Sequence, residues 1–484
     1  MVPGAFRTIA YVNGLFCLYV ALAMLAPMTV DYVDGNPDWY GFLASGFVIG
    51  TLSAAAILAT RGNLVEFNLR IGFLLVVSLW LSTSLVASLP LVLGTRAVSF
   101  TDALFEAVSG LTTTGSTVLT GLDDMPRGLL LWRSTIQWLG GIGIIAMSLL
   151  ILPFLRIGGM QFFRLESSER ADKPVARLQT FTVWLFSVYG ALTLACMVLY
   201  AAGGMTWFDA LNHAMTTLPT AGYSTHDASF AQFPNAVLIT SIVFMLIGAV
   251  PFTTIAIAMF TGSLRRSLDA QVPIFIGIVI VLGGFAFASA LQSSSFETTD
   301  ALIHAMFNLV SNLTTTGYAT ADYTLWGPVA NGVFLIAMLI GGCAGSTAGG
   351  LKIYRVAILY QSLRASLREL VYPNGVFPIH FSGKRVSPDA LRSVATFLFA
   401  YVGILFVSTL LLTATDLDLV TAFSGALTAI SNVGPGLGPI IGPAGNFSSL
   451  SDEAKWLLTL LMLLGRLEIM TVLVILSPLF WRGN

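Results

Sequence analysis

Four short segments centred on a glycine recur along this chain, and their residue types suit the coordination of a cation by backbone carbonyl oxygens. They read TTTGS at 112–116, TAGYS at 220–224, TTTGY at 314–318 and NVGPG at 432–436. Glycine reaches positive φ without steric cost, so consecutive carbonyl groups in such a loop can aim inward and replace the hydration shell of an ion. Four loops of this kind are able to surround one ion.

These segments belong to longer internal repeats. Shifting residues 105–115 by 202 positions onto 307–317 gives 8 identities in 11 residues, and shifting 102–115 by 107 onto 209–222 gives 7 in 14. The fourth copy keeps its glycine after AFSGALTAISNV and little else. A shared turn preference does not account for so many identities, so the chain is built from repeats.

The composition is that of a membrane protein. Hydrophobic residues make up 56% of the 484, charged residues only 10%, and the mean hydropathy is +0.84, which excludes a soluble domain of this length. The three cysteines are scattered, with no spacing that suggests disulfides or metal ligation. Ten apolar stretches approach the length needed to cross a bilayer, and they lie at 9–29, 41–60, 71–93, 129–153, 178–202, 235–261, 273–292, 329–358, 391–413 and 455–479.

The charges sort by side once these ten spans are drawn. With the N-terminus in the cytoplasm, 18 of the 23 Lys and Arg residues fall inside, which satisfies the positive-inside tendency and returns the C-terminus to the cytoplasm. The acidic residues show the opposite bias, with 16 outside and 7 inside. A negative outer face concentrates cations, although a solvated surface that obeys ordinary topology explains the bias as well.

A short amphipathic stretch precedes each glycine segment on the outer side, at 100–111, 207–218, 298–313 and 419–430. We expect four half-helices whose negative C-terminal ends point at the glycine loops. The acceptors suited to cap them are Thr101 with Asp102, Asp209, Thr299 with Asp300, and Asp416 or Asp418. Irregular backbone at membrane depth is tolerated only around a protein-lined or water-filled cavity. The pattern therefore predicts one central cavity, whereas a helix cap followed by a re-entrant turn explains any single copy.

These four segments between ten spans resemble the potassium-translocating subunits of the TrkH, TrkG and KtrB family, and the extra N-terminal pair of spans favours TrkH or TrkG. The resemblance covers nearly the whole chain and implies an all-α membrane protein with ten transmembrane helices, in which four pseudo-symmetric repeats surround one pore. It implies a K⁺ filter made of Thr113, Thr114, Gly115, Thr220, Ala221, Gly222, Thr315, Thr316, Gly317, Asn432, Val433 and Gly434. We expect a two-span domain at 1–66 and pore repeats at 67–160, 161–268, 269–370 and 371–484.

The eighth span contains five glycines in the ten residues 341–350, where a regular helix is unfavourable because each interior glycine costs about 1 kcal/mol relative to alanine. Close helix packing is the alternative use of small residues. In the resembling family the matching segment is an intramembrane loop that obstructs the pore, so we assign the gate to Gly341, Gly342, Gly345, Ser346, Thr347, Gly349 and Gly350.

Arg466, in the last span, is the only basic residue that this topology places at membrane depth. Charges there are costly and usually functional, and we expect Arg466 to face the cavity below the filter and to oppose cations as part of the gate. Pairing with Glu468 or a helix-locking contact is the alternative, although residues two apart on a helix do not face one another.

The resulting functional hypothesis is potassium uptake across the bacterial inner membrane by channel-like conduction. A symporter coupled to H⁺ or Na⁺ is the alternative, and motifs for an intramembrane enzyme are missing from the sequence. The cytoplasmic basic segments 156–177 and 352–392 suit a soluble partner or anionic lipids. The resemblance implies a TrkA-type nucleotide-binding regulatory ring and a homodimer, with no nucleic-acid partner and no organic cofactor.

Overall fold

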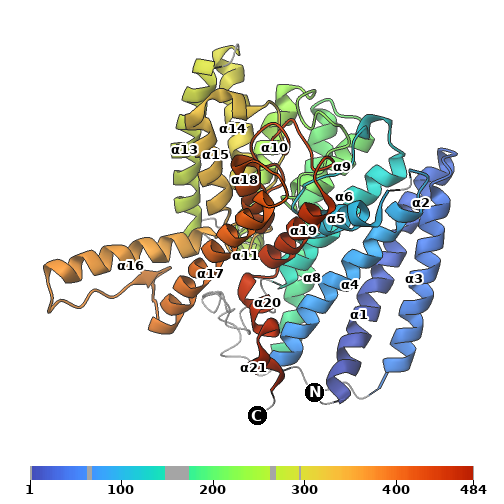
Figure 1. Cartoon of the computed structure of the whole chain (residues 1–484), viewed down its shortest axis with the longest axis horizontal. Helices are drawn as coiled ribbons and strands as arrows, with labels where there is room; N and C mark the ends of the chain where they lie inside the picture. Colours follow the sequence, from blue (N-terminus) through green and yellow to red (C-terminus); the bar gives the residue numbers. More distant parts are fainter. Residues whose placement is uncertain are drawn as a thin grey trace.

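The computed structural model describes residues 3–62, 68–96, 98–147, 174–261, 269–293 and 296–482. Within these ranges the chain is helical apart from its loops and one two-residue hairpin, which pairs His380–Phe381 (β1) with Lys384–Arg385 (β2). The predicted all-α fold is confirmed. Figure 1 shows the helices gathered in one body, with the start of α1 and the end of α21 at the same end of the molecule.

Seven long apolar helical stretches of the described chain can each cross a membrane. They are α1 with α2 (Pro3–Ala23 and Leu25–Val33), α3 (Trp39–Thr60), α4 (Leu69–Leu93), α6 (Arg127–Ala146), α8 (Pro174–Ala202), α13 (Gln271–Ser293) and α17 (Pro388–Thr413).

Three further expected spans are interrupted. Helices α10 (Asn235–Gly248) and α11 (Phe252–Thr261) meet at a bend of 100°, and α19 (Asp452–Arg466) and α20 (Ile469–Leu476) at 108°. Helix α15 (Pro328–Ile340) is a short apolar helix, and the chain resumes as α16 (Ile353–Val371), which projects sideways from the body in Figure 1. These elements account for the remaining three expected spans. The first two breaks were not predicted.

Four short helices occupy the predicted half-helix positions to within one residue: α5 (Phe100–Leu111), α9 (Trp207–Thr217), α14 (Thr298–Leu313) and α18 (Leu419–Ser431). We call them the pore helices. Asp418 caps α18 as expected, but the first two caps are Ser99 and Thr206, each accepting a backbone N–H three residues on. The predicted Asp102 and Asp209 instead lie at the third helical position, where a carboxylate favours the positive end of the helix.

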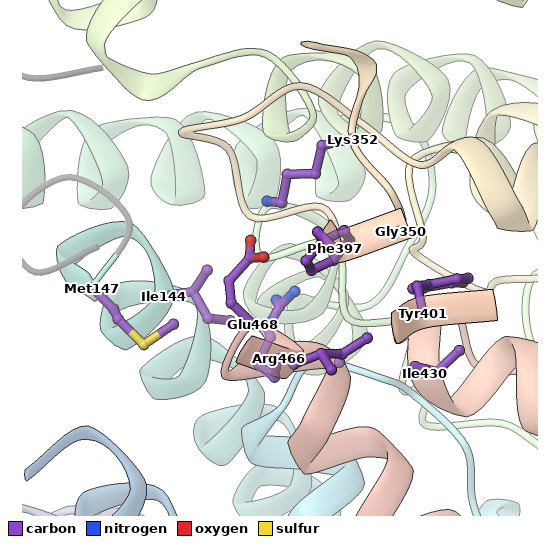
Figure 2. Close-up of a pocket in the computed structure, with 12 residues that line it drawn as sticks. Ile144, Met147, Gly350, Lys352, Phe397, Tyr401, Ile430, Arg466 and Glu468 are labelled. Carbon is purple, nitrogen blue, oxygen red and sulfur yellow. The ribbon is translucent and has the colours of Figure 1, made fainter. Parts of the chain in front are cut away.

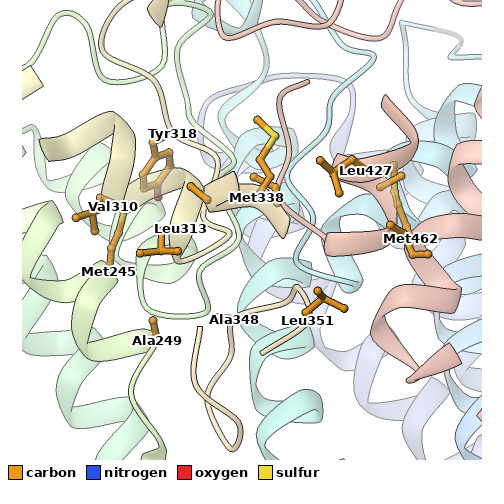
Figure 3. Packing of buried hydrophobic residues seen from close by; sticks show 14 of the residues in the cluster. Met245, Ala249, Val310, Leu313, Tyr318, Met338, Ala348, Leu351, Leu427 and Met462 are labelled. Carbon is orange, nitrogen blue, oxygen red and sulfur yellow. The ribbon is translucent and has the colours of Figure 1, made fainter. Parts of the chain in front are cut away.

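The pore helices pack in a closed cycle. Each contacts the preceding span of its own repeat, as α5 contacts α4 and α14 contacts α13. Each also contacts the second span of the previous repeat: α6 meets α9, α10 meets α14, α15 meets α18, and α19 returns to α5. Figure 3 shows part of the resulting core, where Val310 and Leu313 of α14 and Leu427 of α18 lie among Met245, Met338 and Met462 of the second spans.

The first three helices lie outside this cycle. Helices α1 and α3 contact each other and α4, and α2 contacts α6, where the buried Asp31 accepts a hydrogen bond from Gly128 N (2.7 Å). Helix α6 is one of the two spans of the first repeat, so the N-terminal pair is fastened to that side of the ring.

Candidate functional site

The backbone of the four glycine segments, which we call the filter segments, has the same conformation in each repeat. The first residue of each predicted filter triplet lies within three residues of the end of its pore helix and is left-handed, with φ of 52° at Thr113, 51° at Thr220, 58° at Thr315 and 56° at Asn432. The glycine two residues on is also left-handed, with φ of 85°, 82°, 88° and 118° along the chain. A left-handed residue after a helix satisfies its last carbonyl groups, and glycine is the residue that adopts this φ most freely.

The four filter glycines face one another's backbones around a closed ring. A methyl group added to any of them would meet a carbonyl oxygen of the next repeat. Measured from the added methyl carbon, the distances are 2.3 Å at Gly115 to Ala221 O, 1.9 Å at Gly222 to Thr316 O, 2.2 Å at Gly317 to Val433 O, and 3.0 Å at Gly434 to Thr114 O. The contacts run from repeat 1 through 2, 3 and 4 back to 1, so the four segments surround one axis.

All four filter glycines line one cavity of about 240 Å³. The residues that follow the filter glycines complete its wall, among them Ser116, Tyr223, Ala319 and Pro435. These residues lead from the filter glycines toward the loops that follow them, and the cavity lies on that side of the ring.

The residues 341–350, which we call the gate loop, lie directly against the other side of the ring. Residues 341–349 are buried, and the loop is held by the break between α10 and α11. Cys343 N donates to Ala249 O (3.0 Å), Phe252 N donates to Gly345 O (2.9 Å), and Thr347 Oγ1 donates to Gly248 O (3.0 Å). The bend in this span therefore supplies the backbone groups that seat the loop.

Three repeats are bonded directly to the gate loop at the foot of the ring. Thr220 Oγ1 donates to Thr347 Oγ1 (3.1 Å), Gly349 N donates to Thr315 Oγ1 (2.7 Å), and Gly350 N donates to Ser431 O (3.0 Å). The first repeat is reached through Arg466, whose Nη2 donates to both Thr113 Oγ1 and Thr347 O.

Comparison with known proteins agrees with this architecture. The family model described as TrkH, cation transport protein, matches residues 41–481. The chain belongs to the TrkH family. It is 42% identical to the Trk system potassium uptake protein TrkI of Halomonas elongata, over 97% of this chain and 96% of that one, and 35% identical to TrkH of Escherichia coli, over 99% of each.

A solved structure of the TrkH family shares the whole fold. The crystal structure of the potassium transporter TrkH from Vibrio parahaemolyticus superposes with a TM-score of 0.90 at 37% identity, covering 99% of this chain and 100% of that one. The protein is therefore a multi-pass membrane protein of a cation transport family and not an enzyme.

Arg466 lies between the ring and the gate loop of this TrkH-family protein. It is 5% exposed, and Glu468 does not pair with it but with Arg355, at 2.5 Å. The alternative of an Arg466–Glu468 ion pair is thus wrong, because α19 ends at Arg466 and the 108° bend turns Glu468 toward α16. The Nε of Arg466 is buried without a protein partner.

Arg466 is not the only buried basic residue of the described chain, since Lys455 is buried as well. Lys352, Arg355 and Arg133 are buried too, and of these Lys352 donates from Nζ to Ala348 O of the gate loop (3.0 Å). Lys352, Arg466 and Glu468 line a cavity of about 20 Å³ below the loop, which Figure 2 shows with Gly350 and Tyr401 on its wall. A cavity of this size holds about one water molecule.

One of the two predicted cytoplasmic surfaces changes accordingly. In the basic segment 352–392, Lys352 and Arg355 belong to the gate region, whereas Arg364, Arg368 and Arg392 are exposed. Most of the segment 156–177 lies outside the described residues.

Proposed function

We propose that this chain carries potassium ions inward across the bacterial inner membrane by channel-like conduction through the filter ring. The observation that carries the proposal is the closed cycle of glycine-to-carbonyl contacts around one axis. Backbone carbonyls in a ring replace the hydration shell of a monovalent cation, and the names of the relatives describe potassium uptake.

The gate loop and Arg466 hold this pathway shut in the proposed mechanism. The loop fills the foot of the ring, and the guanidinium joins repeat 1 to the loop. A positive charge at this depth raises the barrier for a cation. Opening then requires the loop to leave Thr220, Thr315 and Ser431, which it contacts through three hydrogen bonds.

Channel-like conduction is favoured over coupling to protons because both buried glutamates, Glu106 and Glu468, are held in ion pairs. Proton relays in membranes use acidic or His side chains, but Glu106 is paired with Arg133 at 2.8 Å and Glu468 with Arg355 at 2.5 Å. Neither carboxylate is free to shuttle a proton. Coupling to Na⁺ through carbonyl groups alone is the form of symport that the flux experiment below tests.

The regulation and topology that we propose follow from the family and the charge bias. A TrkA-type nucleotide-binding ring would bind the cytoplasmic face, the chain would form a homodimer, and both termini would lie in the cytoplasm. The exposed Arg364, Arg368 and Arg392 near α16 and α17 offer basic contacts for that ring or for anionic lipids. Co-purification with a TrkA partner in mild detergent tests this part.

Flux of ⁸⁶Rb⁺ into liposomes that contain the purified chain tests the central proposal. Downhill uptake that K⁺ inhibits far better than Na⁺ or Li⁺ is expected, with addition of the regulatory partner if the closed gate keeps the basal rate low. Uptake that appears only with an imposed Na⁺ or H⁺ gradient would replace conduction by symport.

A further inference from the structure

A polar side chain in the middle of each pore helix is bonded to the segment that follows the filter glycine. These residues are Glu106, His213, Asn308 and Ser424, and all four are buried. The first three occupy the same repeat position, since the shifts of 107 and 202 residues that align the repeats carry Glu106 onto His213 and Asn308. Because their side chains differ in charge and size, what they share is their location behind the filter segment of each repeat.

Three of the four contacts reach the equivalent backbone N–H, and the fourth reaches a neighbouring one indirectly. Glu106 Oε2 accepts from Val118 N (3.0 Å), Asn308 Oδ1 from Thr320 N (3.1 Å), and Ser424 Oγ from Leu437 N (2.9 Å). In the second repeat the contact passes through a hydroxyl: His213 Nε2 lies 3.0 Å from Ser224 Oγ, which accepts from His226 N (3.1 Å). Val118, Thr320 and Leu437 each lie three residues after a filter glycine.

The first repeat is the charged member of this set. Arg133 of α6, 1% exposed, donates from Nε to Glu106 (2.8 Å), from Nη2 to Thr117 Oγ1 (3.2 Å) and from Nη1 to Ser224 O (3.0 Å). Its guanidinium also lies 4.1 Å from the ring centre of Tyr223, the residue after Gly222. The pair therefore fixes filter segments 1 and 2 relative to each other.

We infer that these four side chains, which we call the buttresses, hold the backbone behind the filter and so set the diameter of the filter ring. Among them, the Glu106–Arg133 pair contributes most to the discrimination between K⁺ and smaller cations, as a pair of positioning residues. This inference rests on the proposed function. Burial makes charge-assisted hydrogen bonds strong and short, and a buried network with all its members bonded rigidifies its surroundings. A ring that is held rigid cannot contract around Na⁺, whereas a slackened ring can.

The decisive variant is Glu106→Gln, which keeps the shape of the side chain but replaces one acceptor oxygen with a donor that faces Arg133 or Val118 N. We expect the preference for K⁺ over Na⁺ to fall about tenfold, the factor that about 1.4 kcal/mol represents. The double variant Glu106→Gln with Arg133→Gln removes the charge mismatch and should recover part of the preference. Ser424→Ala, which removes a single neutral acceptor, should lower it less.

Asp102→Asn is the matched control. Asp102 is also a carboxylate of α5 in an ion pair, with Lys455 at 2.7 Å, but it lies at the outer end of the helix, where it contacts its cap Ser99. The substitution Asp102→Asn removes the same charge from the same helix without changing a contact to a filter segment. Its cation preference should equal that of the wild type.

Two readouts on the full-length purified protein keep the inference separate from the proposed function. The first is the rise in melting temperature on adding KCl or NaCl, which reports ion binding without transport, and the second is ⁸⁶Rb⁺ uptake with K⁺ or Na⁺ as competitor. A purely structural role would lower the yield and the melting temperature of Glu106→Gln but leave the ratio between K⁺ and Na⁺ unchanged, and that result would overturn the inference.

The same two measurements on the wild-type protein test the remaining possibilities. Equal stabilisation by K⁺ and Na⁺ would also overturn the inference, because there would be no discrimination for the buttresses to set. Selective stabilisation without Rb⁺ uptake, even with the regulatory partner present, would contradict the proposed function alone.

Discussion

The filter ring and the gate region below it are built on opposite principles. In the ring, all four repeats contribute the same two left-handed positions and the same glycine-to-carbonyl contact. In the gate region, the third repeat alone supplies the loop, the second and fourth repeats supply bends of 100° and 108°, and α6 of the first repeat continues unbroken to Ala146. Backbone contacts close the ring, whereas the loop is joined to it both by a backbone bond, Gly350 N to Ser431 O, and by the side chains of Thr347 and Arg466.

This difference explains where symmetry is kept and where it is lost. In the proposed function, an ion on the axis meets four backbones at once, so every repeat must present equivalent groups. The proposed gate needs only one obstacle that can move, and the remaining repeats need only contacts that hold it. Changes in the ring should therefore abolish selective transport, while changes in the gate region should release it.

Gly222→Ala should have the largest effect, because it breaks the ring where it is tightest. The new methyl group would lie 1.9 Å from Thr316 O, at a residue with φ of 82°. The left-handed conformation alone costs a non-glycine residue roughly 1–2 kcal/mol, and the overlap adds to it. We expect at least a hundredfold loss of ⁸⁶Rb⁺ uptake, which an uptake assay at matched protein levels would measure.

Two alanine variants calibrate this result. Gly434→Ala, with a contact of 3.0 Å, should lose less activity, and Gly277→Ala in α13, where nothing lies within 4 Å, should be neutral. Equal activity of Gly222→Ala and Gly277→Ala would refute the ring as the conducting site.

Arg466→Ala should act in the opposite direction. It removes the buried charge and both contacts that join Thr113 to the gate loop, so we expect basal uptake to rise about tenfold, equivalent to about 1.4 kcal/mol of lost barrier. Deletion within 342–348 should raise it as well. The exposed Arg482 provides a control, Arg482→Ala, that removes a positive charge away from the gate. Reduced uptake by Arg466→Ala at normal expression would assign it a structural role instead.

Thr347→Val tests the side-chain contacts of the loop with a smaller change. The hydroxyl bonds to Gly248 O (3.0 Å), Leu218 O (3.2 Å) and Thr220 Oγ1 (3.1 Å), and valine has nearly the same shape. A hydrogen bond contributes about 1 kcal/mol, so basal uptake should rise several-fold. Thr240→Val removes a hydroxyl that bonds only within its own helix, to Ala236 O. If both variants conduct alike, the hydroxyl contacts of Thr347 do not hold the gate.

The regular part of the molecule was predictable and the irregular part was not. The pore helices follow from local sequence, because an amphipathic stretch ends at a glycine in every repeat, and the structure reproduces their bounds to within one residue. The break after Gly248 had a local signal in Pro251, which cannot continue a helix without losing a hydrogen bond. The bend at Glu468, with φ of 59°, has no such proline signal, and the partner of Glu468 there, Arg355, lies far away in the sequence.

Buried ion pairs escaped prediction for a related reason. Arg133 and Glu106 are 27 residues apart in different helices, so a count of charges by loop assigned Arg133 to the outer surface. Lys352 and Arg355 were grouped with a cytoplasmic patch because a single sequence does not show where the gate loop ends. Only the folded chain brings each charge to its partner.

The smallest effect that we predict concerns a tie between repeats above the ring. His226, in the segment after filter segment 2, lies 2.5 Å by Nδ1 from Asp123 of the segment after filter segment 1, and 3.5 Å by Nε2 from Asp209 of α9. The hydrogen bond with Asp209, reinforced by Asp123, raises the pKa of His226 above its ordinary value of 6.5, and the hydrogen bond with His226 lowers the pKa of Asp123.

Because the folded pKa of His226 is raised, its contribution to stability is complete below about pH 6.5 and is lost as the pH rises through the folded value. The melting temperature of the wild type should therefore fall over this range by more than that of His226→Asn, which carries no titrating group. Parallel curves for the two proteins would show that protonation of His226 does not strengthen its contacts with Asp123 and Asp209.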